Sequence, residues 1–237
     1  MKRKIVLNGR SIEYDLRRKK VKNINLRIKR DMSVLVSANE RVPIATVEAF
    51  IQSKSTLILR ALDKYKEFAK KADVTQELKD GDNIQFFGNM LQLKVIEDRT
   101  NRAEIAGELI LLRVKDISST ELKKKTLLSL FDPILREKIT QLCKAVYPTF
   151  AKTCGTFPEL RFRHMRSRWG SCAPQKGILT FNYSLVHAPE DCIEYVVYHE
   201  FTHFLHPNHS KSFYASLSRH IPDYKERKKR LEQTPIL

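Results

Sequence analysis

A short motif, His199-Glu200-Phe201-Thr202-His203, constrains the fold more than any other part of the chain. Two histidines four residues apart on a helix project from one face about one turn apart, so their imidazoles can bind one metal ion. Zn²⁺ binds imidazole nitrogen well, and a catalytic zinc site has three protein ligands and one position open for water. Glu200 is placed to act as a general base on that water. We therefore expect a third ligand near the end of this helix.

Two further histidines, His206 and His209, compete for the third position. Pro207 disfavours helical geometry at His206 and removes a backbone donor, so the helix is expected to stop there. A chain that turns back can bring His209 to the metal, and the spacing matches the long zincin pattern, with His206 at its glycine position. His206 is the alternative, because seven residues after His199 is nearly two helical turns. We predict His199, His203 and His209 as ligands.

The residues before the motif favour a metal site over a chance match. Residues 194–198 form a largely apolar run, which predicts a buried helix. A glutamate and two histidines carried into a core by such a helix would be costly without a partner, and a metal ion is the obvious partner. Pro189 is expected to open this helix, because Glu190 and Asp191 follow it where the helix dipole favours acidic side chains.

The length and composition suit a globular protein of the cytoplasm. The 237 residues can bury a full core, and 42% of them are hydrophobic. Since the chain has no run of 18 or more apolar residues, we expect no membrane span. The N-terminus is positively charged, but its apolar segment is too short for a secretory signal. The four cysteines form no C-x-x-C pair, so we expect reduced, mostly buried thiols.

The N-terminal segment carries most of the excess positive charge. The formal net charge is +17, and residues 1–71 hold 19 of the 44 Lys and Arg but only 7 of the 27 Asp and Glu. Such a segment attracts polyanions, which include nucleic acid, nucleotides and acidic proteins. Lysines that only keep the surface soluble are the alternative. Aromatic residues are not interleaved with the charges, which weakens the case for nucleic acid.

Residues 11–71 predict paired strands followed by a helix. Residues 24–29 alternate between apolar and polar side chains, residues 30–33 can turn, and residues 34–36 resume the extended pattern, which together predict a β-hairpin. Pro43 then opens a helical pattern that fades near residue 71. This pattern fits either one long helix or two helices with a break near residues 53–55.

Further strands are expected in residues 78–114. A Gly88-Asn89 turn is expected to divide residues 84–95 into two strands, and residues 109–112 form a buried edge or central strand. Residues 1–115 would thus form a basic, β-rich subdomain with one long helix. Residues 116–237 would form a zincin-like, metal-binding catalytic domain.

The C-terminal half predicts an α+β core. We expect a helix in residues 120–147, ended by Pro148. A strand is expected to run from residue 160 toward residue 172 and to turn back into residues 178–182. The fold class is therefore α+β, with the HExxH helix beside a small antiparallel sheet. Ser210 is expected to cap the next helix, and a last basic helix follows Pro222.

Several motifs resemble the YgjP-like metallohydrolase family, whose relatives are the SprT-like and minigluzincin proteases. The resemblance rests on residues 167–172, 179–182, 195–200 and 208–214, and it extends weakly to residues 17–28 and 81–88. It implies a zincin-like fold, zinc on His199, His203 and His209, and Glu200 as the base. The chain departs from the family at Thr56-Leu57 and at Phe213-Tyr214, where the family commonly has tryptophan, but neither departure involves a predicted ligand.

The motif and the resemblance together predict a zinc-dependent metallopeptidase acting on a peptide or protein substrate. A metal-activated water would attack the peptide bond with Glu200 as general base. The strand around residues 169–171 could align an extended peptide by backbone pairing. Arg168, His164 and Tyr198 are candidate donors to the oxyanion of the transition state.

Two alternative functions use the same sequence features. The first is a nucleoside triphosphate (UTP) pyrophosphatase with the same metal site, which the basic charge and the family's association with this activity support. A site of three histidines argues mildly against it, because magnesium-dependent phosphate chemistry favours carboxylate ligands. The second is a DNA-associated binding module with a structural zinc, which would use the basic N-terminal segment.

Overall fold

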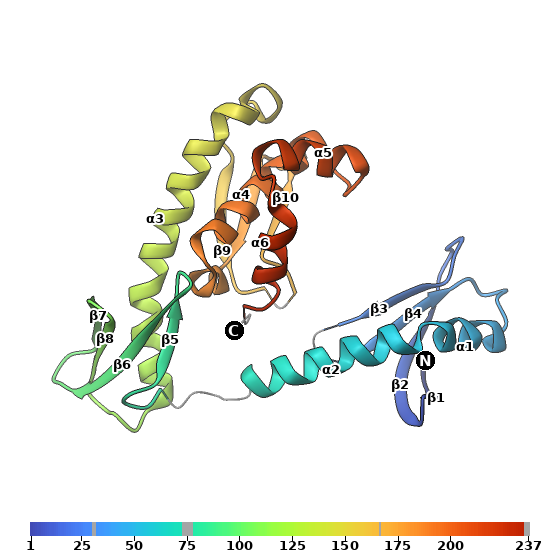
Figure 1. Cartoon of the computed structure of the whole chain (residues 1–237), viewed down its shortest axis with the longest axis horizontal. Coiled ribbons are helices and arrows are strands. Elements are labelled where there is room, and N and C mark those ends of the chain that lie inside the picture. The colour runs from blue at the N-terminus through green and yellow to red at the C-terminus, as the bar shows by residue number, and fades with distance from the viewer. Residues whose placement is uncertain (30–31, 73–77, 166, 235–237) are drawn as a thin grey trace. The chain divides into compact units, whose positions relative to one another are not determined.

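The structure, a computed structural model, describes residues 1–29, 32–72, 78–165 and 167–234. It confirms a mixed α+β fold in which helices accompany three small sheets (Figure 1). The chain divides into two compact units, Met1–Val74 (unit 1) and Thr75–Leu237 (unit 2). No helix in the described ranges combines the length and the apolar character that crossing a membrane requires.

Unit 1 contains a four-stranded sheet of order β1-β2-β4-β3. Its strands are β1 (Lys2–Leu7), β2 (Arg10–Arg18), β3 (Asn25–Ile28) and β4 (Val34–Ala38). β3 and β4 pair antiparallel, which confirms the predicted hairpin, although residues 30–31 of its turn lie outside the described ranges. β2 pairs antiparallel with β1 and parallel with β4.

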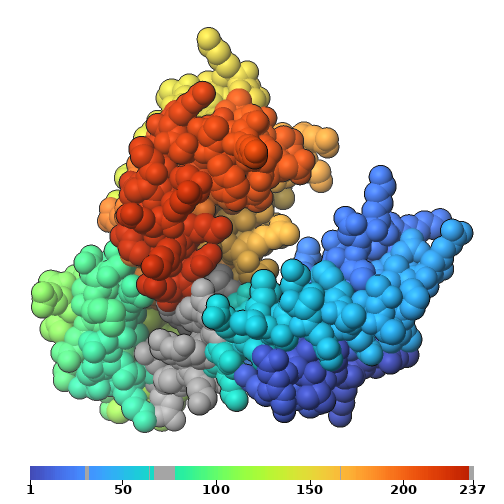
Figure 2. All heavy atoms as spheres, turned by 45° about the vertical axis from the view of Figure 1, so that its right-hand side comes forward, coloured from blue at the N-terminus to red at the C-terminus, as the bar shows by residue number. Residues whose placement is uncertain are grey.

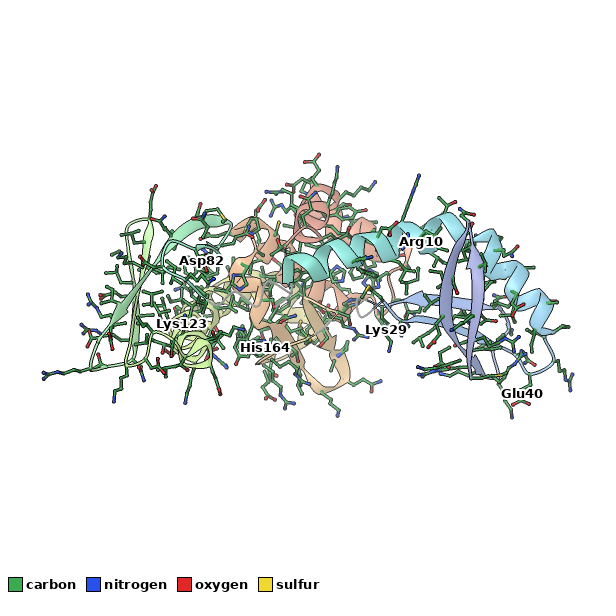
Figure 3. All side chains as sticks on the ribbon, turned by 90° about the horizontal axis from the view of Figure 1, so that it is seen from below. Arg10, Lys29, Glu40, Asp82, Lys123 and His164 are labelled. Atoms are coloured by element: carbon green, nitrogen blue, oxygen red, sulfur yellow. The ribbon has the colours of Figure 1, made fainter. Side chains whose placement is uncertain are left out.

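Two helices, α1 (Ile44–Ser53) and α2 (Ser55–Ala72), cover one face of this sheet (Figures 1 and 3). The helical pattern of residues 43–71 is thus broken at Lys54, and the two-helix alternative is correct. Strand alternation places one set of side chains under these helices. The buried core of unit 1 contains Tyr14, Leu16, Val34, Val36, Val47, Ile51, Ile58 and Leu62.

The basic side chains of unit 1 lie mainly at its surface. The exposed ones on and beside the strands are Lys2, Lys4, Arg10, Arg17, Lys19, Lys20, Lys22, Arg27 and Lys29; Figure 3 labels Arg10 and Lys29. Some of them pair with acids, as Lys2 does with Glu13 and Arg10 with Asp63. Contact with nucleic acid through this segment stays a prediction.

Unit 2 begins with a second four-stranded sheet of order β5-β6-β8-β7. Its strands are β5 (Asn83–Phe86), β6 (Asn89–Glu97), β7 (Arg102–Ala106) and β8 (Leu109–Val114). β8 is a central strand, which decides between the two predicted positions. The turn between β5 and β6 lies one residue earlier than predicted, at Phe87 and Gly88. Phe87 has a φ of 46° and Gly88 a φ of 84°.

This second sheet belongs with the C-terminal half of the chain and not with the N-terminal segment. The boundary between the compact units therefore lies after Val74, not at residue 115 where the sequence pattern puts it. The reason is packing: Leu93, Ile110 and Leu112 are buried in the same core as the C-terminal helices. The Phe87 N–H also donates to the Val186 carbonyl at 2.7 Å.

The long helix α3 (Thr120–Cys154) passes through Pro133 and Pro148, so the predicted end at Pro148 is wrong. A proline removes one helical hydrogen bond, but the buried side of the helix continues beyond it to Phe150. The helix ends instead at Gly155, whose φ of 72° suits glycine. The Tyr147 hydroxyl donates to the Gly155 carbonyl and closes the end of the helix.

The third sheet has the order β10-β11-β9. Its strands are β9 (Glu159–Arg163), β10 (Gly170–Ala173) and β11 (Ile178–Asn182). The single strand predicted from residue 160 to residue 172 is wrong, because β9 and β10 lie on opposite sides of β11. β9 is parallel to β11 and β10 is antiparallel, so the sheet is mixed and not antiparallel.

A buried side chain, Asn182, explains why β9 and β10 separate. Its Nδ2 group donates to the carbonyls of Met165 at 2.7 Å and Arg168 at 2.8 Å. A side-chain amide that satisfies loop carbonyls lets the chain leave the sheet without losing those hydrogen bonds. The segment between β9 and β10 is thereby fastened to the end of β11.

All four cysteines are free, as expected for reduced thiols. Cys143 and Cys192 are buried, whereas Cys154 and Cys172 are partly buried. Burial raises the pKa of the Cys154 thiol to about 11. Thiols with such raised pKa values are poor nucleophiles near neutral pH.

Replacing Gly88 by alanine should test how tightly the second sheet is docked. A Cβ at Gly88 would lie 2.9 Å from the Pro189 Cα, whereas a Cβ at Gly107 would meet no atom within 4 Å. Both glycines have positive φ, so Gly107→Ala should lower the free energy of unfolding by about 1 kcal/mol. Gly88→Ala should lower it by about 2 to 4 kcal/mol, because the steric clash adds to that cost. Equal losses in denaturant titrations would contradict the close docking.

Candidate metal centre

The helix α4 (Glu190–Leu205) carries the HExxH motif. It begins directly after Pro189, with acidic residues in its first turn, and ends at Leu205, as the sequence predicts. His206 already has an extended backbone, with φ −134° and ψ 100°. α4 packs against α3, α5, α6 and β10, so Glu200 of the motif is buried, while His199 and His203 are partly exposed.

The chain after α4 brings three imidazoles together. His199, His203 and His209 each offer a ring nitrogen, and these atoms lie within 4.8 Å of one another. The Nε2 atoms of His199 and His209 are only 2.9 Å apart. Ser210 then caps α5 (Lys211–His220) by accepting a hydrogen bond from the Phe213 N–H, as predicted. This cap fixes the position of the turn that carries His209.

The buried ring of Phe213 supports the cluster from one side. Its centroid lies 4.9 Å from that of His199 and 4.8 Å from those of His203 and His209. Phe213 itself has no exposed surface. Packing against one rigid ring restricts the rotamers of all three imidazoles, which favours a preformed site.

The competing histidine, His206, does not join the cluster. Its Nε2 atom lies 2.9 Å from the Ser216 hydroxyl. Its backbone carbonyl lies 3.1 Å from Nδ1 of His203 and can accept the proton of that nitrogen. Such a hydrogen bond leaves Nε2 of His203 as the atom with a free lone pair. His206 thus orients a neighbouring imidazole through its main chain.

Desolvation favours the neutral form of each imidazole, most strongly at His199, whereas His209 is exposed. Burial is the main cause that lowers the pKa of His199 to about 3, and the charges of His203, His209 and Lys228 lower it further. Burial also lowers the pKa values of His203 and His209. Neutral imidazoles offer a lone pair to a metal ion without first releasing a proton. The donor set therefore fits a metal ion.

The carboxyl group of Glu200 lies against the first residue of β10. A Cβ added to Gly170 would come within 2.6 Å of Glu200 Oε1, so only glycine leaves room for the carboxylate. Glu200 is 5% exposed. Burial raises its pKa to about 8, and the positive charge of Arg168 opposes this rise.

The three predicted oxyanion donors differ in where their side chains lie. Arg168 is the one whose charge acts on Glu200. The Tyr198 ring stacks on His220, with centroids 5.3 Å apart, so it serves packing. His164, labelled in Figure 3, is exposed and packs on the Tyr183 ring at 4.9 Å.

Tyr195 is a residue that sequence reasoning missed. Its hydroxyl lies 3.4 Å from Nδ1 of His199, on the side of the ring opposite the cluster. The signal was present, because Tyr195 precedes His199 by four residues, a spacing that places both on one helix face. A partner at this nitrogen helps to fix the orientation of a ligating imidazole.

Comparison with known proteins identifies the family. Residues 22–234 match the family model described as the YgjP-like metallopeptidase domain. The chain belongs to the YgjP-like family. This confirms the resemblance seen in the sequence, and it supports a metallopeptidase-type hydrolase with a metal cofactor. No match to a curated protein was found.

Metal content should distinguish the two histidines beyond the helix. We expect about one metal ion per chain for the wild type. His209→Ala should lose most of the metal, because it removes one of three converging nitrogens. His206→Ala should keep it, because the backbone carbonyl that faces His203 remains. Elemental analysis after desalting measures this, with circular dichroism as the folding control. Equal loss in both variants would refute the assignment.

Proposed function

We propose that this YgjP-like chain is a zinc-dependent peptidase in which Glu200 is the general base and His199, His203 and His209 hold the metal. The donor set supports zinc, because zinc accepts three neutral imidazoles and keeps a fourth position for water. Hard cations such as magnesium prefer oxygen ligands.

The observation that carries this proposal is the position of Glu200. It follows His199 directly on α4, and its carboxylate lies against Gly170 at the start of β10. A purely structural metal site needs no buried carboxylate next to one of its ligands in the chain. The same carboxylate in a catalytic site can exchange a proton with water.

β10 offers a surface on which an extended peptide could pair. It is an edge strand in the described part of the chain. The Asn182 N–H donates to the Trp169 carbonyl, so alternate residues of β10 pair with β11. The main-chain groups of Gly170 and Cys172 consequently point away from β11. A substrate strand could bind them by β-augmentation, with its backbone beside Glu200.

In the reaction, Glu200 would accept a proton from the attacking water and deliver it to the leaving amine. A zinc ion held by the three imidazoles would supply the Lewis acidity that activates water and polarises the carbonyl. Tyr195 and the His206 carbonyl would keep two of the imidazoles oriented. Arg168 would stabilise negative charge that develops near Glu200.

Glu200→Gln should reduce the rate at which the zinc-loaded protein hydrolyses casein or an unfolded polypeptide by about 100-fold to 10,000-fold. Glutamine fills the same space against Gly170 but cannot accept the proton. The metal content should not change, because Glu200 is not among the proposed ligands. Glu190→Gln, at the exposed start of the same helix, is the matched control and should keep full activity.

The same samples should be assayed with UTP, since a pyrophosphatase is the alternative function. Cleavage of UTP that depends on Glu200, without cleavage of polypeptide, would replace the peptidase proposal. An activity that survives in Glu200→Gln would belong to a contaminant. If the metal-loaded wild type cleaves neither substrate and binds DNA with a steep salt dependence, the binding-module alternative would be favoured.

A further inference from the structure

The C-terminal helix α6 (Tyr224–Leu231) uses only some of its basic residues to hold its place. Arg227 donates to the carboxylates of Asp223 at 2.9 Å and Glu194 at 2.6 Å. Its Nη1 atom also donates to the Asp191 carbonyl at 3.0 Å, and Arg230 pairs with the Asp191 carboxylate. The contacts with Glu194 and Asp191 fasten α6 to the first half of α4 (Figure 1).

The helical register of α6 places Lys228 on the same side of the helix as Tyr224 and Leu231. At 100° per residue, Tyr224, Lys228 and Leu231 lie on one side of the helix, with Lys228 on the flank away from Arg227. Leu231 is 2% exposed. The Tyr224 ring stacks on Tyr214 with centroids 5.6 Å apart, and the Tyr214 ring lies 6.1 Å from that of His209. Lys228 is therefore held on the side of α6 that adjoins the histidines.

The charge of Lys228 reaches the cluster. Its charge lowers the pKa of His209 after the larger effect of burial, and it lowers the pKa of His199 less than burial, His203 and His209 do. Within the described part of the chain, no hydrogen bond or ion pair involves its ammonium group, whereas Arg227 and Arg230 are both paired. Lys228 is exposed. The C-terminal segment, drawn in red, lies at the surface of unit 2 (Figure 2).

A second cation, Arg168, lies near the same centre from the side of β10. Its charge acts on Glu200. Its side chain is exposed and likewise has no ion-pair partner among the described residues. An unpaired basic side chain beside the imidazoles would repel a metal cation. An anionic ligand would offset this repulsion.

We propose that Lys228, together with Arg168, binds an anionic group of the substrate beside the metal centre. This inference rests on the proposed function and specifies its substrate class: a peptide that carries a carboxylate close to the cleaved bond. A lysine ammonium binds carboxylate or phosphate as a point charge, so a substrate phosphate is the second source of the same chemistry. In either case Lys228 selects the substrate and takes no part in the proton transfer.

The test compares two peptides that differ only by Glu or Gln next to the cleaved bond. The zinc-loaded wild type should cleave the Glu peptide with the lower KM. Lys228→Ala should raise the KM for the Glu peptide about tenfold and leave kcat and the Gln peptide almost unchanged. Lys229→Ala, on the outer side of the same helix, is the matched control and should behave as the wild type. Lys228→Arg should keep most of the preference for the Glu peptide, because arginine carries the same charge.

A binding experiment separates this inference from the peptidase proposal. The two peptides, inorganic phosphate and UTP are titrated calorimetrically into zinc-loaded Glu200→Gln, with and without Lys228→Ala. Weaker binding of the Glu peptide alone in the double variant supports a substrate carboxylate even if no peptide is cleaved. Weaker binding of phosphate and UTP alone assigns the anion to a phosphate. If Lys228→Ala leaves the affinity for every anion unchanged, the inference is wrong.

Discussion

The end of α4 at Leu205 is the constraint on which the metal centre depends. A helix that continued would present His206 to the first two histidines and would carry His209 away from them. Because Pro207 follows, the backbone at His206 is extended and the chain turns back into α5. The same turn points the His206 carbonyl at His203 and so selects the nitrogen that faces the cluster. One break in a helix thus places a third imidazole and orients a second.

The rest of unit 2 holds this helix in a defined position. The β5–β6 turn packs on Pro189 at its start, Arg227 of α6 binds the acidic residues of its first half, and Gly170 of β10 lies against Glu200 near its middle. Two of these contacts are made at glycines, Gly88 and Gly170, and the third is a charged hydrogen bond. A site supported in this way can keep its groups in place before a ligand arrives.

Local signals made parts of this architecture predictable. The end of α4 follows from Pro207, and the cap of α5 follows from Ser210. The β3–β4 hairpin follows from an alternating apolar and polar pattern. Each of these signals acts on its neighbours in the chain. The errors involve distant contacts. Pro148 does not end α3 because Phe150 is still buried, β9 and β10 separate because Asn182 binds the loop between them, and the second sheet joins unit 2 through its core. For the site, the motif indicated which histidines converge, but no pattern indicated that Gly170 lies against Glu200 or that Lys228 lies on the side of α6 nearest the histidines.

The central claim is that three imidazoles hold a zinc ion and leave one position for solvent. X-ray absorption at the zinc edge of the loaded protein tests it most directly. The account predicts three imidazole nitrogens at about 2.0 to 2.1 Å and one oxygen at a similar distance. A sulfur scatterer at about 2.3 Å, as expected if Cys172 were a ligand, or fewer than three imidazoles, would contradict it.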